Sequence, residues 1–209
     1  MTFRVFNENF EKYDDWYKAH QIFFECEAKV LRELNLQGRG LSIGVGTGIL
    51  DSQANIEIGI DPALNMLKIA ANRKINVILA SSEYLPFKQS TFDFILMVVT
   101  ICFLEAPETS FKELKKVIKS KGILAICIVP KESSWGQTYM EKIKKGHTFY
   151  QYAKFYSIPE IDSLLKRHSF KIIETKSTLS YSPDSPPVIE EPSDSPENMG
   201  FVCIKSMKI

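Results

Sequence analysis

The chain has 209 residues, 44% of them hydrophobic and 24% charged, which suits one α/β domain with a full core over residues 1–209. Its 26 Lys and Arg residues against 25 Asp and Glu residues leave a net charge of +1, so no global field draws it to nucleic acid or anionic membranes. The first residues lack the apolar core of a signal peptide, and the longest apolar stretch, 94–104, is well short of the roughly 20 residues that span a bilayer. We expect a cytoplasmic protein that binds neither nucleic acid nor membranes, with its oligomeric state left open.

The amino-terminal part predicts helix. Residues 6–36 carry helix formers, and apolar side chains such as Phe23, Val30 and Leu31 recur near helical spacing. Glycines follow at the end of this pattern. We expect residues 1–37 to form a helical lid or a helix anchored on the core.

From residue 40 onward, short apolar runs alternate with helical patterns, which is the rhythm of parallel βαβ units. The expected strands are 40–44, 57–60, 76–79, 92–99 and 122–129, and the expected helices start near 48 and cover 63–73 and 107–118.

A different organisation follows Pro130, which ends the fifth expected strand. A polar, aromatic-rich insert over 131–156 precedes a helix at 159–168. Two further strands near 170–178 and 200–205 are expected to pair antiparallel, joined by a mobile, Pro-rich loop over 179–199. The whole predicts an α/β fold with a doubly wound, mostly parallel seven-stranded sheet and an antiparallel last strand.

The four cysteines are far apart in the chain, lie mostly in apolar stretches and form no Cys-x-x-Cys pair. They are Cys26, Cys102, Cys127 and Cys203. This pattern predicts reduced core residues. No His and Cys spacing suggests zinc and no carboxylate cluster suggests magnesium, so no metal site is expected.

The most informative segment is 44–48, which reads Gly-Val-Gly-Thr-Gly directly after a buried apolar run. Glycine is required where a backbone takes positive φ or touches a ligand. Asp61 follows at the end of the next apolar run, where a carboxylate can accept hydrogen bonds from both hydroxyls of a ribose. A tight turn, and a helix cap at Asp61 before Pro62, are the alternatives, and the cap is compatible with ribose binding. Together these residues predict a site for a nucleotide-type cofactor.

These motifs and several later ones resemble the class I S-adenosylmethionine-dependent methyltransferases, in particular the small-molecule branch. The resemblance covers residues 38–170, including the adenine-loop segment 82–87 and the fourth-strand segment 91–96. It implies a Rossmann-like methyltransferase fold, S-adenosylmethionine as cofactor and methyl transfer to an N, O or C nucleophile of a small-molecule acceptor. The cofactor-binding residues that it implies are Gly44, Val45, Gly46, Gly48, Asp61, Pro62, Ser81, Ser82, Glu83 and Met97.

The chain departs from the family pattern at two positions. Ser42 stands where the family has an acidic residue that holds the amino end of the methionine moiety, and Ser81 stands where many members have an acid in the adenine loop. Ser42 keeps a non-catalytic, methyltransferase-like binding or scaffold protein as an alternative. A nicotinamide-dependent oxidoreductase is less favoured, because its Gly-x-Gly-x-x-Gly spacing differs from the Gly-x-Gly-x-Gly found in this chain.

Aromatic and histidine side chains flank the expected mouth of the site and are candidates for contact with the acceptor. These candidates are Tyr13, Trp16, His20, His147 and Tyr150. Anchoring of the leading helix in the core is the alternative for the first three. No catalytic residue is assigned, because a sulfonium already makes its methyl group electrophilic and a dedicated base is optional.

Overall fold

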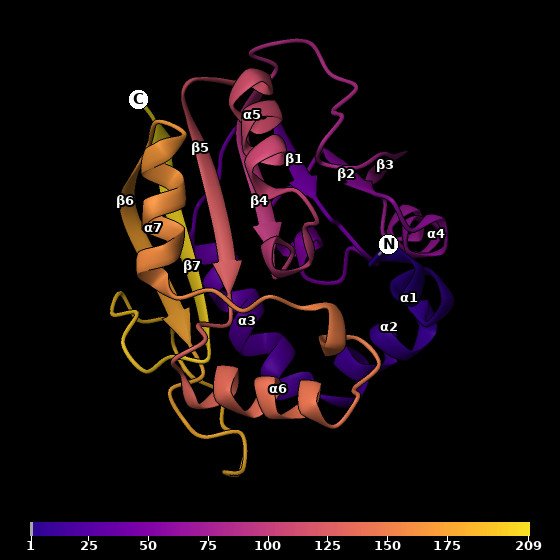
Figure 1. The fold of residues 1–209 in the computed structure, drawn as a ribbon, viewed down its shortest axis with the longest axis vertical. Helices are drawn as coiled ribbons and strands as arrows, with labels where there is room; N and C mark the ends of the chain where they lie inside the picture. Colours follow the sequence, from indigo (N-terminus) through magenta and orange to yellow (C-terminus); the bar gives the residue numbers. More distant parts are fainter. Residues whose placement is uncertain (1) are drawn as a thin grey trace.

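The computed structural model describes residues 2–209 and has seven strands in one sheet, in the order β3-β2-β1-β4-β5-β7-β6 (Figure 1). The strands are β1 (Gly40–Ile43), β2 (Ile58–Asp61), β3 (Asn76–Leu79), β4 (Phe92–Val98), β5 (Ile118–Ile128), β6 (Phe170–Thr178) and β7 (Phe201–Lys208). Strands β1 to β5 pair parallel, whereas β7 is antiparallel to both β5 and β6. The predicted fold class is confirmed, including the antiparallel last strand.

Within residues 2–209, seven α-helices and three short 3₁₀ turns surround this sheet. The helices are α1 (Phe3–Glu8), α2 (Phe10–Ala19), α3 (Gln21–Glu33), α4 (Leu64–Asn72), α5 (Pro107–Val117), α6 (Ser134–Lys144) and α7 (Ile158–Arg167). The 3₁₀ turns are η1 (Asp51–Gln53), η2 (Ile101–Phe103) and η3 (Tyr150–Tyr152). The predicted leading helical segment is thus three helices, and the aromatic insert contains α6 and η3.

The core lies on both faces of the sheet, as alternation along β4 illustrates. Ile95 and Met97 pack in one cluster with side chains of α5 and α7, whereas Leu96 and Val98 pack in the other with side chains of α3. This alternation follows from the two-residue period of a strand. In Figure 1, α5 and α7 lie in front of the sheet and α3 lies behind it.

The prediction of a helix that starts near residue 48 is wrong, because only the short turn η1 forms there. Leu50 and Ala54 of this segment pack in the same cluster as Val30 and Leu31 of α3. The face that a helix after β1 would cover is therefore covered by α3. The buried side chain of Asp51 is turned inward, which favours a local turn over a helix.

The expectation that all four cysteines are reduced is also wrong. Cys127 of β5 and Cys203 of β7 lie directly opposite one another in the antiparallel register and form a disulfide. Cys26 and Cys102 are free and buried, as expected. The paired cysteines are 76 residues apart in the chain, so only the neighbourhood of their strands brings them together.

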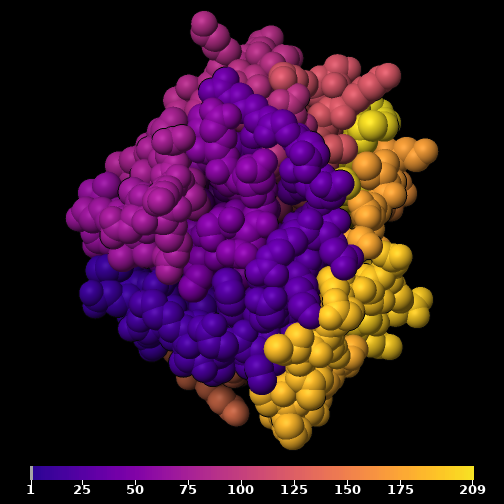
Figure 2. Space-filling model, turned by 180° about the vertical axis from the view of Figure 1, so that it is seen from behind, coloured from indigo at the N-terminus to yellow at the C-terminus, as the bar shows by residue number. Residues whose placement is uncertain are grey.

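The Pro-rich segment 179–199 runs along α3. Its Glu191 forms an ion pair with Lys29, and the Cys26 thiol of α3 contacts the backbone at Val188 and Glu190. Figure 2 shows the yellow carboxyl-terminal residues beside the indigo amino-terminal ones. The loop therefore contributes to the cover of α3. Among residues 2–209, no helix combines the length and apolarity that a membrane crossing requires.

Candidate active site

The carboxyl ends of β1, β4 and β5 point toward a region enclosed by α1, α2 and α6 (Figure 1). The chain after β1 turns sharply there, with φ values of +67° at Gly44 and +54° at Gly46. A Cβ at Gly44 would lie 2.3 Å from a methyl carbon of Thr100, whereas a Cβ at Gly46 would meet no atom within 4 Å. The glycine loop is thus close-packed at one residue and open toward a cavity at the other.

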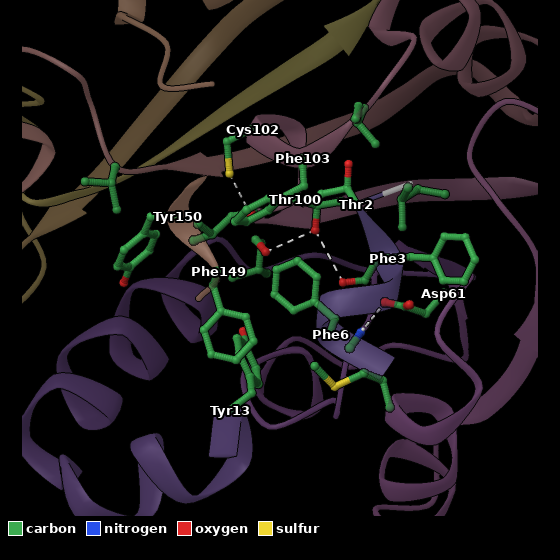
Figure 3. Close-up of a pocket in the computed structure, with 18 of the residues that line it drawn as sticks. Thr2, Phe3, Phe6, Tyr13, Asp61, Thr100, Cys102, Phe103, Phe149 and Tyr150 are labelled. Atoms are coloured by element: carbon green, nitrogen blue, oxygen red, sulfur yellow. Dashed lines mark hydrogen bonds between the residues drawn. The ribbon is translucent and has the colours of Figure 1, made fainter. Parts of the chain in front are cut away.

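Asp61, at the end of β2, faces the same loop and is only 9% exposed. One carboxylate oxygen accepts a hydrogen bond from the Gly46 backbone N–H at 2.9 Å (Figure 3), and the other accepts one from the backbone N–H of Ala63, just before α4, at 2.7 Å. Burial raises the pKa of Asp61 to about 6, against the opposing effect of these two hydrogen bonds. Each oxygen keeps a second lone pair, so the carboxylate can still accept donors from a ligand.

Asp51 places a carboxyl group beside Ser42, the position at which the family has an acidic residue. The buried Ser42 hydroxyl donates a hydrogen bond of 2.5 Å to Asp51, whose side chain is 5% exposed. Burial raises the pKa of Asp51 to about 7, and the Ser42 hydroxyl opposes that rise. The sequence pattern did not point to Asp51, because the short turn η1 rather than a motif brings it to Ser42.

A cavity of about 750 Å³ extends from the glycine loop toward the amino-terminal helices and the aromatic insert. Seven of the ten predicted cofactor residues line it: Gly44, Gly46, Asp61, Pro62, Ser81, Ser82 and Glu83. The Ser82 hydroxyl is hydrogen-bonded to Ser110 of α5 at 2.7 Å, so its side chain is held toward that helix. We call this end of the cavity the cofactor half.

The other three predicted cofactor residues lie off the cavity. Met97 is fully buried in the core against α5 and α7, because it points to the opposite face from Val98, which does line the cavity. Val45 packs in a small cluster with α4, and Gly48 lies against the side chains of that helix. Met97, Val45 and Gly48 thus pack against the core and α4, and their contact with the cofactor stays a prediction.

The far end of the cavity is lined by aromatic side chains, and we call it the acceptor half. All five predicted acceptor residues line it: Tyr13, Trp16, His20, His147 and Tyr150. The Phe6 ring of α1 stacks on Phe149 at 5.1 Å and meets Phe103 edge-on at 4.9 Å between centroids (Figure 3). These three rings connect the amino-terminal helices with η2 and the insert, so segments distant in the chain enclose one space.

Two polar contacts join the amino-terminal helices to the cofactor half. The Arg73 guanidinium donates to Asp14 of α2 at 3.0 Å and to the Thr47 carbonyl of the glycine loop at 2.8 Å. Asn65 of α4 is bonded to Asn7 of α1 through both its backbone N–H and its side-chain amide. The position of the predicted lid is thus coupled to the loop that would contact the cofactor.

One residue of the acceptor half was missed by the sequence analysis. Glu27 of α3 lines the cavity, is 7% exposed and accepts a hydrogen bond of 3.3 Å from the Tyr17 hydroxyl. Burial raises its pKa to about 8, against the opposing hydrogen bond from Tyr17. The available signal was a carboxylate four residues after Phe23 and four before Leu31, on the apolar face of a helix.

Comparison with known proteins identifies the family. Residues 41–126 match a family model described as a methyltransferase domain. The chain is 33% identical to a crystallised protein of Thermotoga maritima, described as an S-adenosylmethionine-dependent methyltransferase and possible histamine N-methyltransferase, with a TM-score of 0.94 over 100% of both chains. This chain belongs to the class I S-adenosylmethionine-dependent methyltransferases.

Two further relatives of this methyltransferase have no described activity. An uncharacterized protein of Methanocaldococcus jannaschii is 38% identical over 98% of this chain and 99% of its own length. An uncharacterized protein of Mycobacterium tuberculosis is 32% identical over 82% of this chain, and the match spans 61% of that longer protein.

The cofactor of this methyltransferase is S-adenosylmethionine, and the cofactor half fits it. The empty space beside Gly46 leaves room for a ligand against the loop, and Asp61 presents a carboxylate to the same space. Family membership favours an enzyme over the scaffold alternative and excludes the nicotinamide-dependent oxidoreductase.

Proposed function

We propose that this enzyme transfers the methyl group of S-adenosylmethionine to an N, O or C nucleophile of a small-molecule acceptor bound in the acceptor half. One observation carries the proposal: the cofactor half and the acceptor half form one continuous cavity. Its aromatic lining and volume suit a small organic molecule, since ligand pockets are typically about 300–1,000 Å³ and mostly apolar.

The cofactor would be held by the residues that line the cofactor half. Gly44 and Gly46 would cradle its methionine part, and Asp61 would accept hydrogen bonds from its ribose hydroxyls. Ser81, Ser82 and Glu83, in the loop after β3, would lie beside the adenine. Bound there, S-adenosylmethionine supplies a methyl group that its sulfonium makes electrophilic.

The protein's own contribution would be alignment and exclusion of water. Holding two reactants in line can contribute roughly 7–11 kcal/mol to a reaction of this kind. Phe6, Phe103 and Phe149 would close the cavity against solvent, and the faces of Tyr13, Trp16 and Tyr150 would attract positive charge. His20 and His147 complete this lining as proposed acceptor contacts.

A net charge of +1 supports a soluble small molecule, rather than nucleic acid or a membrane component, as the acceptor. We propose that the reaction takes place in the cytoplasm.

The proposal is tested with purified enzyme, S-adenosylmethionine and a panel of small amines, alcohols, phenols and acids, with products followed by mass spectrometry. We expect at least one acceptor to gain a single methyl group together with equimolar S-adenosylhomocysteine. The Asp61→Ala variant serves as the control for contaminating enzymes. Cofactor binding without turnover of any acceptor above that control would contradict the proposal.

A further inference from the structure

The carboxyl group of Glu27 has no counter-ion among residues 2–209. Among residues 2–209, the Tyr17 hydroxyl is the single polar partner of this side chain, and no cationic side chain pairs with it. Glu27 is more than nine-tenths buried, yet it lines the cavity. An ionised carboxylate without a partner is costly to bury, which is why the pKa of Glu27 is raised to about 8, and a cationic ligand in the cavity would offset that cost and favour the ionised form.

The surroundings of Glu27 suit a cation. Tyr13, Tyr17, Tyr139 and Tyr150 also line the cavity, and their hydroxyls are held neutral, because burial raises each pKa and the Glu27 charge raises it further. Tyrosine faces attract organic cations, and this attraction is stronger where water is excluded.

The charged groups of the acceptor half are arranged unequally. Lys12 and Lys142 also line the cavity, and both lower the pKa of His147, on which burial has the largest effect. Lys142 itself lies over the Tyr139 ring, with 5.1 Å between its Nζ and the ring centroid. Positive charge thus gathers near His147 and negative charge lies at Glu27, so a cationic ligand would have a preferred orientation.

We propose that the acceptor of this methyltransferase carries an organic ammonium group, which Glu27 binds as counter-ion among the four tyrosines that line the cavity. A second atom of the same molecule, with a free lone pair, takes the methyl group from the sulfonium and releases its proton to solvent, and the thioether S-adenosylhomocysteine is the leaving group. This inference rests on the proposed function and adds the chemical class of the acceptor. Glu27 acts as a binding residue: its carboxylate receives the charge, and Tyr17 positions that carboxylate by its hydrogen bond.

The test is calorimetric titration of the protein saturated with S-adenosylhomocysteine. The probes are phenethylamine, putrescine and choline, each against its neutral isostere: phenethyl alcohol, butanediol and dimethylbutanol. We expect at least one cation to bind about tenfold or more tightly than its isostere, as for a charge-assisted contact in a buried site. If no cation of the panel binds more tightly than its neutral counterpart, the proposal is overturned.

Three variants test whether Glu27 is the residue that causes the preference for cations. Glu27→Gln keeps the side-chain shape and should reduce affinity for the preferred cation at least about tenfold, and Tyr17→Phe should reduce it by a smaller factor. Glu25→Gln, on the same helix but paired with Arg32 outside the cavity, is the matched control and should bind the cation like the unchanged protein. Equal cation affinity in Glu27→Gln and Glu25→Gln would overturn the proposal.

Titration with S-adenosylhomocysteine separates this inference from the proposed function. All three variants should bind it as tightly as the unchanged protein, because none of these side chains lies in the cofactor half. Intact cofactor binding with no preference for cations would defeat the inference alone. Absence of cofactor binding in the unchanged protein would defeat the proposed function as well.

Discussion

The two halves of the cavity are built in different ways. In the cofactor half, the glycine loop and Asp61 act through backbone groups and one carboxylate, and both belong to short contiguous segments at the ends of β1 and β2. In the acceptor half, side chains from α1, α2, α3, α6 and η3 surround the space. The cofactor half suits a ligand that is the same in every reaction of the family, because its contacts come largely from the backbone. The acceptor half can become specific for another acceptor when side chains on these helices are exchanged, while the fold stays the same.

The largest expected effect is the loss of cofactor binding on removal of the Asp61 carboxylate. Asp61→Ala removes the predicted contacts to ribose and the contact that orients Gly46, for a loss of about 3 kcal/mol, or roughly 100-fold in affinity for S-adenosylhomocysteine. Calorimetry measures this directly. Asp61→Asn should bind almost as weakly, because both oxygens accept backbone N–H groups and an amide nitrogen would replace one of them. Near-normal binding of S-adenosylhomocysteine by either variant would contradict the proposed contact between Asp61 and the cofactor.

The second effect separates stability from function in the acceptor half. The folded pKa of Glu27 is raised to about 8, so the folded state holds more protons than the unfolded state above pH 4.5, and stability falls as pH rises through this window. Glu27→Gln should therefore be more stable than the unchanged protein by up to about 5 kcal/mol above pH 8, and the gain should vanish toward pH 4.5.

Urea denaturation at both ends of that pH window measures this difference. Glu25→Gln is again the control, since the pKa of Glu25 is lowered by its hydrogen bond with Arg32 and its loss should bring no gain at high pH. A Glu27→Gln variant that is less stable at every pH would show that the carboxylate serves the fold instead of a ligand.

A third, smaller effect compares two glycines of similar conformation. Gly46 and Gly146 both have positive φ, and a Cβ at either would meet no atom within 4 Å, but only Gly46 lines the cavity. Alanine at each should cost about 1 kcal/mol of stability. Gly46→Ala should also weaken S-adenosylhomocysteine binding about tenfold, because its methyl group enters the ligand's space, whereas Gly146→Ala should not. Equal affinities in calorimetry would place the cofactor elsewhere.

The smallest effect concerns the junction between the halves. Arg73→Gln removes the bonds to Asp14 and to the Thr47 carbonyl, which should loosen α2 and weaken cofactor binding about fivefold, or about 1 kcal/mol. Hydrogen exchange over residues 10–19 should increase. Arg167→Gln, which loses a surface pair with Glu108 away from the cavity, should leave both measurements unchanged. Unchanged hydrogen exchange over residues 10–19 in Arg73→Gln would contradict the coupling between α2 and the glycine loop.

The contrast between the cofactor half and the acceptor half explains which features could be predicted from the sequence. Strand positions and the proposed roles of Gly46 and Asp61 follow from local patterns, in which apolar runs, glycines and a carboxylate occur close together in the chain. The family resemblance led in the same way to Pro62 and the segment 81–83. It also led to Met97, whose side chain the two-residue period of β4 turns away from the cavity.

The missed features all depend on segments that meet only in the folded protein. Asp51 meets Ser42 of β1 because the chain forms the short turn η1 there, and Cys127 meets Cys203 because β7 inserts between β5 and β6. Glu27 was hidden for a similar reason. Its helical position suggested core, and only the arrangement of α2 and α6 turns that position into the wall of a cavity.

The most direct test of the central claim is calorimetric titration of the unchanged protein with S-adenosylmethionine and S-adenosylhomocysteine, with NAD as the comparison ligand. The account predicts one binding site per chain for each of the first two ligands and no binding of NAD. Failure of both S-adenosyl compounds to bind, or binding of NAD alone, would contradict it.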